Sequence, residues 1–458
     1  MDFLSSLLNG VAERGRALIG LDAVPGSSAR STEGLCRDLL SGRGQASGIA
    51  LAQAILADWE RLDAPGRQAF FKMLQHQFGA DQAHCARAID AYRERPDLAN
   101  TAALHRASQP RIQELLQRLN LAPGGTLLLV RMREALFEAM KGDRELEELD
   151  SAFKYLFASW FNRGFLTMER IDWRSPANVL EKIIRYEAVH EIDGWEDLRR
   201  RLEPADRRCF AFFHPQLVDE PLIFVEVALT VDIPSRIDSL LSADRSVLPP
   251  SAAKTAVFYS ISNCQEGLRG VSFGNFLIKA VAENLKHELP GLETFVTLSP
   301  LPGFARWLQS LDTGSDCIQL SAEDQADLLS LNVARYRGNQ GGKSRRNDLL
   351  ARLAAYYLVG ARSDTGTIID PVARFHLGNG ARLERINVDA NRSERGLSES
   401  YGVMVNYLYD LYGIETNHEA FAERNEVIAS SHVNKLVRTM KSSRPRPSST
   451  RRERASVL

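Results

Sequence analysis

The sequence has few cysteines, and their spacing suits neither a metal site nor a disulfide framework. Five occur among 458 residues, and no two form a CxxC pair. Structural zinc sites use such pairs, and small secreted domains use many more cysteines. The five, an odd number, are Cys36, Cys85, Cys209, Cys264 and Cys317. We therefore expect a reducing compartment, the cytoplasm, and no metal site.

The sequence also lacks a long apolar run and an excess of charge of either sign. No run approaches the ~20 apolar residues that a membrane-spanning helix needs. The N-terminus carries Asp2 and lacks the basic segment of a secretory signal. The formal net charge is -1 at pH 7, so no overall field attracts nucleic acid or an anionic membrane. We therefore expect neither nucleic acid nor a membrane among the partners.

What is present is an ordinary globular composition, 44% hydrophobic and 25% charged, whose first part has helical periodicity. Over residues 1–190, apolar side chains recur every three or four positions. Ser175-Pro176 is typical of a cap followed by a first helical residue, and predicts a helix to about Val189. We predict an all-helical domain here. Its apolar faces fit core packing, and some could instead be buried against a second subunit.

Residues 191–437 have a different pattern and form the second predicted domain. Short segments rich in β-branched and aromatic residues, several bounded by polar turns, predict strands over 209–214, 222–230, 255–262, 294–298, 372–377 and 381–386. Helices are predicted over 273–287, 304–311, 348–359 and 398–411. Strands mixed with helices indicate an α/β or α+β domain with a mixed sheet. Residues 438–458 are rich in Arg, Ser and Pro, which predicts a disordered basic tail.

A glycine-containing loop between the predicted strand 255–262 and the predicted helix 273–287 suggests an anion site. Glycines let the backbone approach a ligand closely, and amides at a helix start attract anions. Arg269 adds a charge-assisted donor. The alternative is a loop that merely connects the two elements. We predict that the loop binds a pyrophosphate through Arg269, Gly270, Val271, Ser272, Phe273 and Gly274.

This loop admits two further interpretations. It has no Walker A or dinucleotide fingerprint, but it resembles the acetyl-CoA loop of GNAT-type acyltransferases. Arg269, Ser272 and Gly274 would take the aligned positions, with the middle glycine of that loop missing. The same residues spell GxSxG, in which Ser272 would be a hydrolase nucleophile. A nucleophile elbow needs its serine directly after a strand, and Ser272 lies well beyond Ser262, which disfavours this interpretation.

A rigid corner follows the predicted strand 294–298. Its sequence, Ser299-Pro300-Leu301-Pro302-Gly303, combines prolines, which fix φ, with a glycine, which permits unusual dihedrals. Side chains at helical spacing follow it. The corner is either a simple turn or a means of fixing the direction of the Ser299 hydroxyl.

His376 is the histidine with the most suggestive surroundings. It lies in the predicted strand 372–377, and Gly378-Asn379-Gly380 predicts a hairpin after it. Alternation along a strand would turn the imidazole away from the core, toward solvent or a cleft. A histidine there with a pKa near neutrality could deliver a proton. The alternative is a hydrogen-bonded strand histidine without chemistry.

Several long stretches closely resemble the malonyl-CoA decarboxylase family. They are AVFYSISNCQEGLRGVSFGNFLIKAVAENL, TLSPLPGFARWL, DPVARFHLGNGARLERIN and SYGVMVNYLY, with RRCFAFFHPQLVDEPLIFVEVALT also similar. The resemblance covers most of the chain from Trp195 to Tyr412 and extends more weakly into the helical half. It implies a helical domain that takes part in oligomerisation, usually as a tetramer. It also implies a catalytic domain of GNAT fold.

The resemblance further implies a reaction and its residues. The family converts malonyl-CoA to acetyl-CoA and CO2, and its serine and histidine pair falls on Ser299 and His376. A further tyrosine of the site matches Tyr409. An acidic residue of the animal enzymes would fall at Ser272, where this chain departs from the pattern. The end of the sequence, Ser456-Val457-Leu458, does not match their peroxisomal Ser-Lys-Leu signal.

From this resemblance we expect a cofactor-free mechanism. Loss of CO2 leaves an enolate, for which the thioester carbonyl is the electron sink. Ser299 would donate a hydrogen bond to the carboxylate or the oxyanion, His376 would protonate the α-carbon, and Tyr409 would orient the imidazole or the carboxylate. Three other functions stay open. They are an acyl-CoA-dependent N-acyltransferase, a serine thioesterase using Ser272 or Ser299, and a non-catalytic scaffold.

Overall fold

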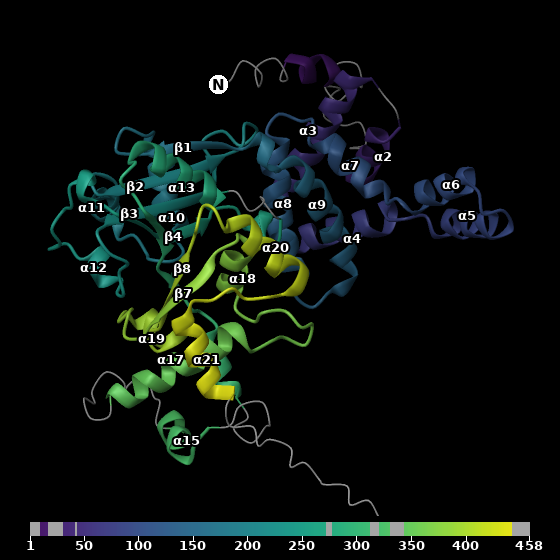
Figure 1. Cartoon of the computed structure of the whole chain (residues 1–458). Coiled ribbons are helices and arrows are strands. Elements are labelled where there is room, and N and C mark those ends of the chain that lie inside the picture. Colours follow the sequence, from purple (N-terminus) through teal and green to yellow (C-terminus); the bar gives the residue numbers. More distant parts are fainter. Residues whose placement is uncertain are drawn as a thin grey trace, which may run out of the picture.

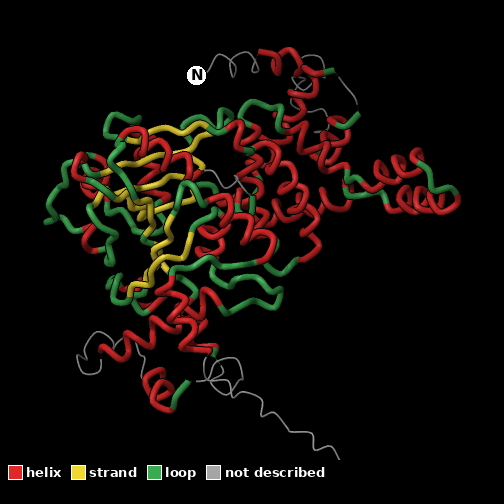
Figure 2. Tube along the Cα trace, viewed as in Figure 1, coloured by secondary structure: helices red, strands yellow, loops and turns green. Residues whose placement is uncertain are grey.

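The structure, a computed structural model, describes residues 10–16, 31–41, 44–271, 277–311, 320–329 and 343–441. A helical region, first in the sequence, lies beside a twisted sheet that carries helices on its faces (Figure 1, Figure 2). The predicted α+β class, with an all-helical part followed by a mixed sheet, is confirmed.

The helical region is built from helices joined by short loops. Their bounds are α2 Thr32–Leu39, α3 Gln45–Arg61, α4 Ala64–Phe78, α5 Gln82–Glu94, α6 Leu98–Ser108, α7 Arg111–Leu119, α8 Gly125–Ala139 and α9 Glu147–Trp160. Asp63, Asp81 and Asp97 begin three of these helices, each accepting a backbone amide of the first turn. All of these helices except α5 and α6 share one core, in which Phe71 and Phe153 are fully buried. The pair α5 and α6 projects from the rest (Figure 1).

The sheet has eight strands in the order β1-β2-β3-β4-β5-β8-β6, with β7 also paired to β8. Their bounds are β1 Thr167–Ile171, β2 Arg207–Phe213, β3 Pro221–Thr230, β4 Thr255–Asn263, β5 Thr294–Thr297, β6 Ser299–Pro300, β7 Arg382–Asn387 and β8 Met404–Leu408. All neighbours are antiparallel except β4 and β5, which are parallel. The sheet is therefore mixed, as predicted.

Strand β2 shows that helices cover both faces of the sheet. Its side chains alternate between two cores: Phe210 and Phe212 pack in the core that includes α13, and Cys209 and Ala211 in the core that includes α10 and α11. The central strands read as continuous apolar runs because both of their faces are buried.

The two central strands separate halfway along β4. β5 pairs only with residues 255–258 of β4. The ladder between β3 and β4 then skips Tyr259, which forms a β-bulge. β4 continues to Asn263 paired with β3 alone. Among the described residues, no strand pairs with the other edge of β4 from Tyr259 to Asn263, and we call it the open edge.

The helices of the second region come between and after these strands. They are α10 Ala177–Tyr186, α11 Gly194–Leu202, α12 Asp238–Leu241, α13 Leu277–Glu288, α14 Phe304–Ser310, α15 Ala322–Leu329, α17 Lys343–Val359, α18 Pro371–Gly378, α19 Glu394–Ser400, α20 Ile414–Arg424 and α21 Ser431–Lys441. The predicted strands 209–214, 222–230, 255–262, 294–298 and 381–386 are confirmed as β2, β3, β4, β5 and β7. The predicted helices 304–311 and 348–359 are confirmed as α14 and part of α17, and α13 holds the described part of 273–287.

The helix predicted over 398–411 is wrong. α19 ends at Ser400, where Tyr401 and Gly402 take positive φ angles of 52° and 77° that stop a helix. The chain then forms β8. Because β8 is buried on both faces, its sequence lacks the alternation that marks a half-buried strand.

Two predicted borders also differ from the structure. β1 and α10 precede residue 190 yet belong with the sheet, so the purely helical part is shorter than 1–190. α10 ends at Tyr186, earlier than the predicted Val189. At the other end, α21 continues through Arg438 to Lys441 and buries Met440, so the first predicted tail residues are helical. Residues 442–458 lie outside the described ranges.

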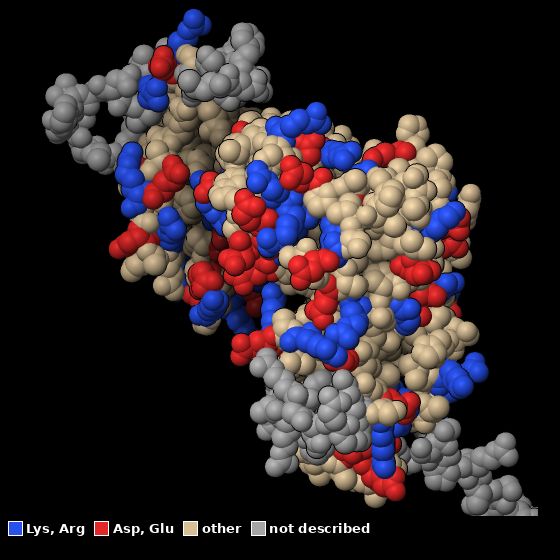
Figure 3. Space-filling view, turned by 90° about the vertical axis from the view of Figure 1, so that its left-hand side faces the viewer, with Lys and Arg blue, Asp and Glu red and all other residues tan. Residues whose placement is uncertain are grey.

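Acidic and basic side chains are interspersed over the face shown in Figure 3, in keeping with the net charge of -1. Among the helices that the structure describes, none is both long and apolar enough to cross a membrane.

Candidate active site

Ser299 lies in a tight corner after β5, as the sequence suggested. β5 ends at Thr297, and Ser299 and Pro300 then pair with β8 as the short strand β6. Gly303 closes the corner against α17, because a Cβ atom there would lie only 2.5 Å from the Tyr357 hydroxyl. Ser299 is held in this corner with 5% of its surface exposed.

His376 lies on helix α18, so the strand predicted over 372–377 is wrong. Asp370 accepts the backbone amide of Ala373, and Pro371 occupies the first turn. A capping aspartate followed by proline is a strong helix start, and it outweighs the strand preference of the apolar residues that follow. This signal was present in the sequence.

The predicted hairpin after His376 is also absent. Gly378-Asn379-Gly380 forms the end of α18, and Gly380 adopts a φ of 78° in the left-handed region. His376 sits in the last turn of the helix and is 3% exposed. The imidazole is therefore buried and lines a cavity, which agrees with the expected cleft and not with the expected exposure to solvent.

The structure brings Ser299, His376 and Tyr409 together in one hydrogen-bonded series. His376 Nε2 lies 2.9 Å from Ser299 Oγ, and its Nδ1 lies 2.8 Å from the Tyr409 hydroxyl. Ser299 Oγ donates to Thr297 Oγ1 at 2.8 Å. With the serine proton directed to Thr297, the neutral imidazole donates from Nε2 to Ser299 and accepts from Tyr409 at Nδ1. The series thus runs from Tyr409 through His376 and Ser299 to Thr297.

Thr297 and Tyr407 support this series, and sequence reasoning missed both. Thr297 Oγ1 accepts the backbone amide of Tyr407 at 3.1 Å, and the Tyr407 ring stacks on the imidazole with centroids 4.5 Å apart. Thr297 lies two positions before Ser299 on adjoining strands, so alternation could have placed it beside the serine. Tyr407 lies in β8, two positions before Tyr409. The wrong helix prediction over 398–411 hid this strand spacing between the two tyrosines.

Burial sets the protonation state of this site. It lowers the pKa of His376 to about 3 and raises that of Tyr409 well above its ordinary value. Both groups are therefore neutral at pH 7. The expectation of a histidine pKa near neutrality is wrong, because it did not include the desolvation of a fully buried imidazole.

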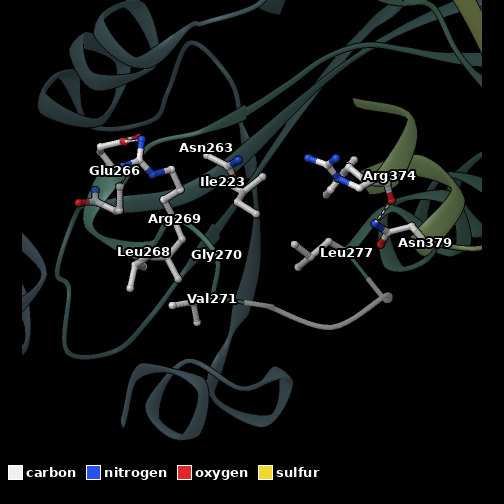
Figure 4. A pocket seen from close by; sticks show the side chains of 14 residues that line it. Ile223, Asn263, Glu266, Leu268, Arg269, Gly270, Val271, Leu277, Arg374 and Asn379 are labelled. Carbon is white, nitrogen blue, oxygen red and sulfur yellow. Dashed lines mark hydrogen bonds and ion pairs between the residues drawn. The ribbon is translucent and has the colours of Figure 1, made fainter. Parts of the chain in front are cut away.

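Two cavities follow the open edge of β4. One, of about 260 Å³, is lined by residues that include Ser299, His376, Phe258 and Ile261. The second, of about 410 Å³, lies at the predicted anion loop and is seen close by in Figure 4. Asn263 lines both, so the two cavities adjoin at the end of β4.

The predicted anion loop lines the larger cavity with its first three residues. Gly270 has a φ of 76°, which explains the glycine. Arg269 forms an ion pair with Glu266 at 2.7 Å, and both side chains are more than half exposed. Val271 is buried. The other three predicted residues, Ser272, Phe273 and Gly274, lie outside the described residues, as does the interpretation of Ser272 as a nucleophile.

Arg374 is a cationic residue of this cavity that sequence reasoning missed. It lies on α18, two positions before His376, and Figure 4 shows it across the cavity from Arg269. Its Nη1 atom donates to the Ile368 carbonyl at 2.6 Å. The cavity therefore has one arginine on each side, a suitable arrangement for a phosphate group.

The site offers no metal ligand set. Within the described ranges, no group of three His, Cys, Asp or Glu side chains could hold a metal ion. Four of the five cysteines are described, and they are free thiols: Cys36, Cys85, Cys209 and Cys264. Cys317 lies outside the described residues.

Comparison with known proteins shows the family of this chain. Family models described as the N-terminal and C-terminal domains of malonyl-CoA decarboxylase match residues 78–161 and 164–446. Solved malonyl-CoA decarboxylases from Rhodopseudomonas palustris and Agrobacterium vitis share 52% and 55% identity with this chain, with TM-scores of 0.84 and 0.82. Each comparison covers 88% of this chain and 98% or 99% of the other. The mitochondrial malonyl-CoA decarboxylase of Anser anser anser is 36% identical over 406 residues, 81% of this chain and 80% of that protein. The chain belongs to the malonyl-CoA decarboxylase family.

Proposed function

We propose that this protein converts malonyl-CoA to acetyl-CoA and CO2 and needs no cofactor for the reaction. The observation that carries the proposal is the buried series of Tyr409, His376 and Ser299 at a cavity beside the open edge of β4. It combines a hydrogen-bond donor for an oxyanion with a proton donor for carbon, which are the two groups that this decarboxylation requires.

The two adjoining cavities suit the two ends of the substrate. The larger one, between Arg269 and Arg374, would take the pyrophosphate of CoA. The pantetheine arm would follow the unpaired edge of β4 past Asn263, where an extended chain can bond to free backbone groups. The malonyl group would then enter the smaller cavity beside Ser299 and His376.

In the proposed reaction, the bond between the α-carbon and the carboxylate breaks and CO2 leaves. The electron pair moves into the thioester carbonyl and forms an enolate. Ser299 donates a hydrogen bond to the malonyl carboxylate or to the enolate oxygen. His376 transfers a proton to the α-carbon, which completes acetyl-CoA. The apolar cavity wall, with Phe258 and Ile261, favours the conversion of a buried carboxylate into neutral CO2.

The substrate supplies the reason for His376 to bind that proton. Before substrate binds, the imidazole is neutral, because burial lowers its pKa to about 3. A malonyl carboxylate beside it introduces a negative charge, which favours the imidazolium and raises this pKa. The proton consumed in the reaction would therefore enter with the substrate. Tyr409, by accepting from Nδ1 in that state, would keep the ring in place.

The experiment is an assay of purified protein with malonyl-CoA in which CO2, acetyl-CoA and free CoA are followed together. We expect equal amounts of CO2 and acetyl-CoA and no free CoA. Free CoA with an acylated protein would show a thioesterase instead. Acyl transfer to an added amine without CO2 would show an N-acyltransferase. If the folded protein forms no product, the non-catalytic scaffold is the remaining function.

We also propose a homo-oligomer, a tetramer by the family resemblance, that works in the cytoplasm. The projecting pair α5 and α6 supports an assembly, because Leu98 is 89% exposed and Ile89 and Tyr92 are partly exposed on it. The helical and sheet regions would act as an assembly domain and a catalytic domain. Light scattering of the native protein tests the tetramer: a monomeric mass contradicts it, and Leu98→Glu should lower the mass if this pair forms the contact.

A further inference from the structure

The anion loop is bound to the helical region more than to the sheet that carries the other active-site residues. Leu268 and Val271 belong to the helical core and not to the core of the sheet. Gly267 lies directly on α8, where a Cβ atom would be 2.0 Å from the Val130 carbonyl oxygen. The Arg269 guanidinium lies over the Phe137 ring of α8, 4.2 Å from its centroid.

Arg133 makes the strongest link between α8 and the loop. Its side chain is 0% exposed, and its Nη1 atom donates to the carbonyls of Gly267 and Arg269 at 2.7 and 2.9 Å. Its Nε atom donates to Asp150 of α9 at 2.8 Å. Asp150 also pairs with Lys154 at 2.7 Å. One buried side chain thus connects two helices to the loop carbonyls on both sides of Leu268, directly before the turn at Gly270.

Only an arginine suits this position. Its planar guanidinium presents separate donors in a fixed fork, so that one edge can bond a carboxylate while another bonds two carbonyls. A lysine has a single nitrogen at the end of a flexible stem. It could keep the ion pair with Asp150, but it would not hold Gly267 and Arg269 at the same time.

We propose that Arg133 is a positioning residue for the CoA end of the substrate, and that the helical region thereby sets the shape of the phosphate site. Arg133 touches no substrate atom; it acts through the backbone of the loop. The inference rests on the proposed function, because it takes this loop as the pyrophosphate site.

The test compares malonyl-CoA with malonyl-pantetheine, which lacks the pyrophosphate and nucleotide. For Arg133→Lys we expect the KM of malonyl-CoA to rise roughly tenfold with little change in kcat, a size typical of losing one or two charge-assisted hydrogen bonds. We expect kcat/KM for malonyl-pantetheine to stay at the wild-type value. A merely structural role of Arg133 would change kcat/KM for both substrates alike.

Arg118→Lys is the matched control. Arg118 also lies in the helical region and also donates to a backbone carbonyl, that of Leu39 at 2.6 Å, but it has no contact with the loop. We expect no change in either KM. Phe137→Leu is the second loop variant, because it removes the ring beneath Arg269 at a half-buried position and leaves the Arg133 bonds intact. It should raise the KM of malonyl-CoA alone.

Two results would overturn the inference. One is an equal loss for both substrates in Arg133→Lys and Phe137→Leu. The other is an unchanged KM for malonyl-CoA in both variants. A wild-type enzyme that does not distinguish malonyl-CoA from malonyl-pantetheine would instead contradict the proposed phosphate site, and the inference with it.

Discussion

The two ends of the substrate cleft are built in different ways. At one end Ser299, His376 and Tyr409 expose 5%, 3% and 1% of their surfaces, and their hydrogen bonds join them to one another. At the other end the side chains of Arg269 and Glu266 are 62% and 53% exposed and pair in contact with solvent. The buried groups can stabilise charge that develops only during reaction, because burial reduces the screening of charge by solvent. The exposed guanidinium of Arg269 can attract a phosphate before reaction.

This comparison predicts separate kinetic effects. Changes at the buried end should lower kcat, because those groups act on the reacting atoms. Changes at the loop should raise KM, because that end holds a part of the substrate that does not react.

The largest effect is expected for His376→Ala. Removing the proton donor should lower kcat by roughly 10²–10⁴. KM should change little, because the phosphate site is untouched. Steady-state kinetics with malonyl-CoA measures both, and the circular dichroism spectrum serves as the control for folding. A large rise in KM with normal kcat would show that the histidine binds the substrate and does not act on it.

Ser299→Ala should have the next largest effect. Loss of one oxyanion donor typically costs roughly 10²–10³ in kcat. Ser310→Ala is the matched control, because its hydroxyl only caps α14 by donating to Trp307 at 2.8 Å on the exposed surface. Both variants are assayed with malonyl-CoA. Near-normal turnover of Ser299→Ala would remove this serine from the mechanism.

Gly303→Ala should affect stability as well as rate. The new Cβ would meet the Tyr357 hydroxyl at 2.5 Å, so α17 or the corner that holds Ser299 must shift. Such overpacking typically costs about 1–3 kcal/mol of unfolding free energy. Gly291→Ala is the control, since its Cβ would make only an ordinary contact at 3.9 Å. Urea denaturation measures the unfolding free energy of both variants. Equal stability of the two variants would show that the corner is not tightly constrained.

The buried histidine should also make the fold sensitive to acid. The pKa of His376 is about 3 in the fold, lowered by burial, against about 6.5 in an unfolded chain. As the pH falls below 6.5, the unfolded state binds a proton that the folded state does not, so stability decreases until the pH reaches about 3. His376→Asn should remove this dependence and reduce the stability lost between pH 7.5 and pH 5 by about 2 kcal/mol.

Urea denaturation at the two pH values measures this difference. His190 keeps a similar dependence in both proteins, because burial lowers its pKa to about 3 as well. The variant should therefore lose some stability on acidification, but less than the wild type. Equal losses would mean that His376 is not neutral in the folded protein.

Arg269→Ala should give the smallest effect. The exposed arginine already pairs with Glu266, and solvent weakens its attraction for a phosphate. We expect KM for malonyl-CoA to rise by less than about tenfold, with kcat unchanged. Arg174→Ala, which removes an exposed arginine paired with Asp172 away from the cleft, is the control. If kcat falls in Arg269→Ala but not in Arg174→Ala, the loop end of the cleft also acts on the reaction step. That result would contradict the separation of kcat effects from KM effects.

The sequence predicted the parts of the site that depend on local chemistry. The strand 294–298 ends in a corner that two prolines and Gly303 make rigid, and Ser299 lies there as expected. The strand, loop and helix order around Arg269 was also predictable, because glycine and arginine mark it locally.

The remaining parts depend on contacts between distant segments. His376 lines the cavity beside Ser299, in keeping with the expected cleft, but its element and pKa were predicted wrongly, because the Asp370 cap was overlooked and burial follows from packing. β8 was hidden by burial on both faces. Arg133 lies far from the loop in the sequence, and no local pattern distinguishes it from the other arginines of the helical region.

The most direct test of the account follows a single turnover of malonyl-CoA in heavy water by mass spectrometry of both acetyl-CoA and protein. The account predicts CO2 release, one solvent deuterium in the methyl group of acetyl-CoA, and a protein of unchanged mass. In His376→Ala the same product should form far more slowly. An acylated protein, or acetyl-CoA without solvent deuterium, would contradict an enolate that is stabilised by Ser299 and protonated by His376.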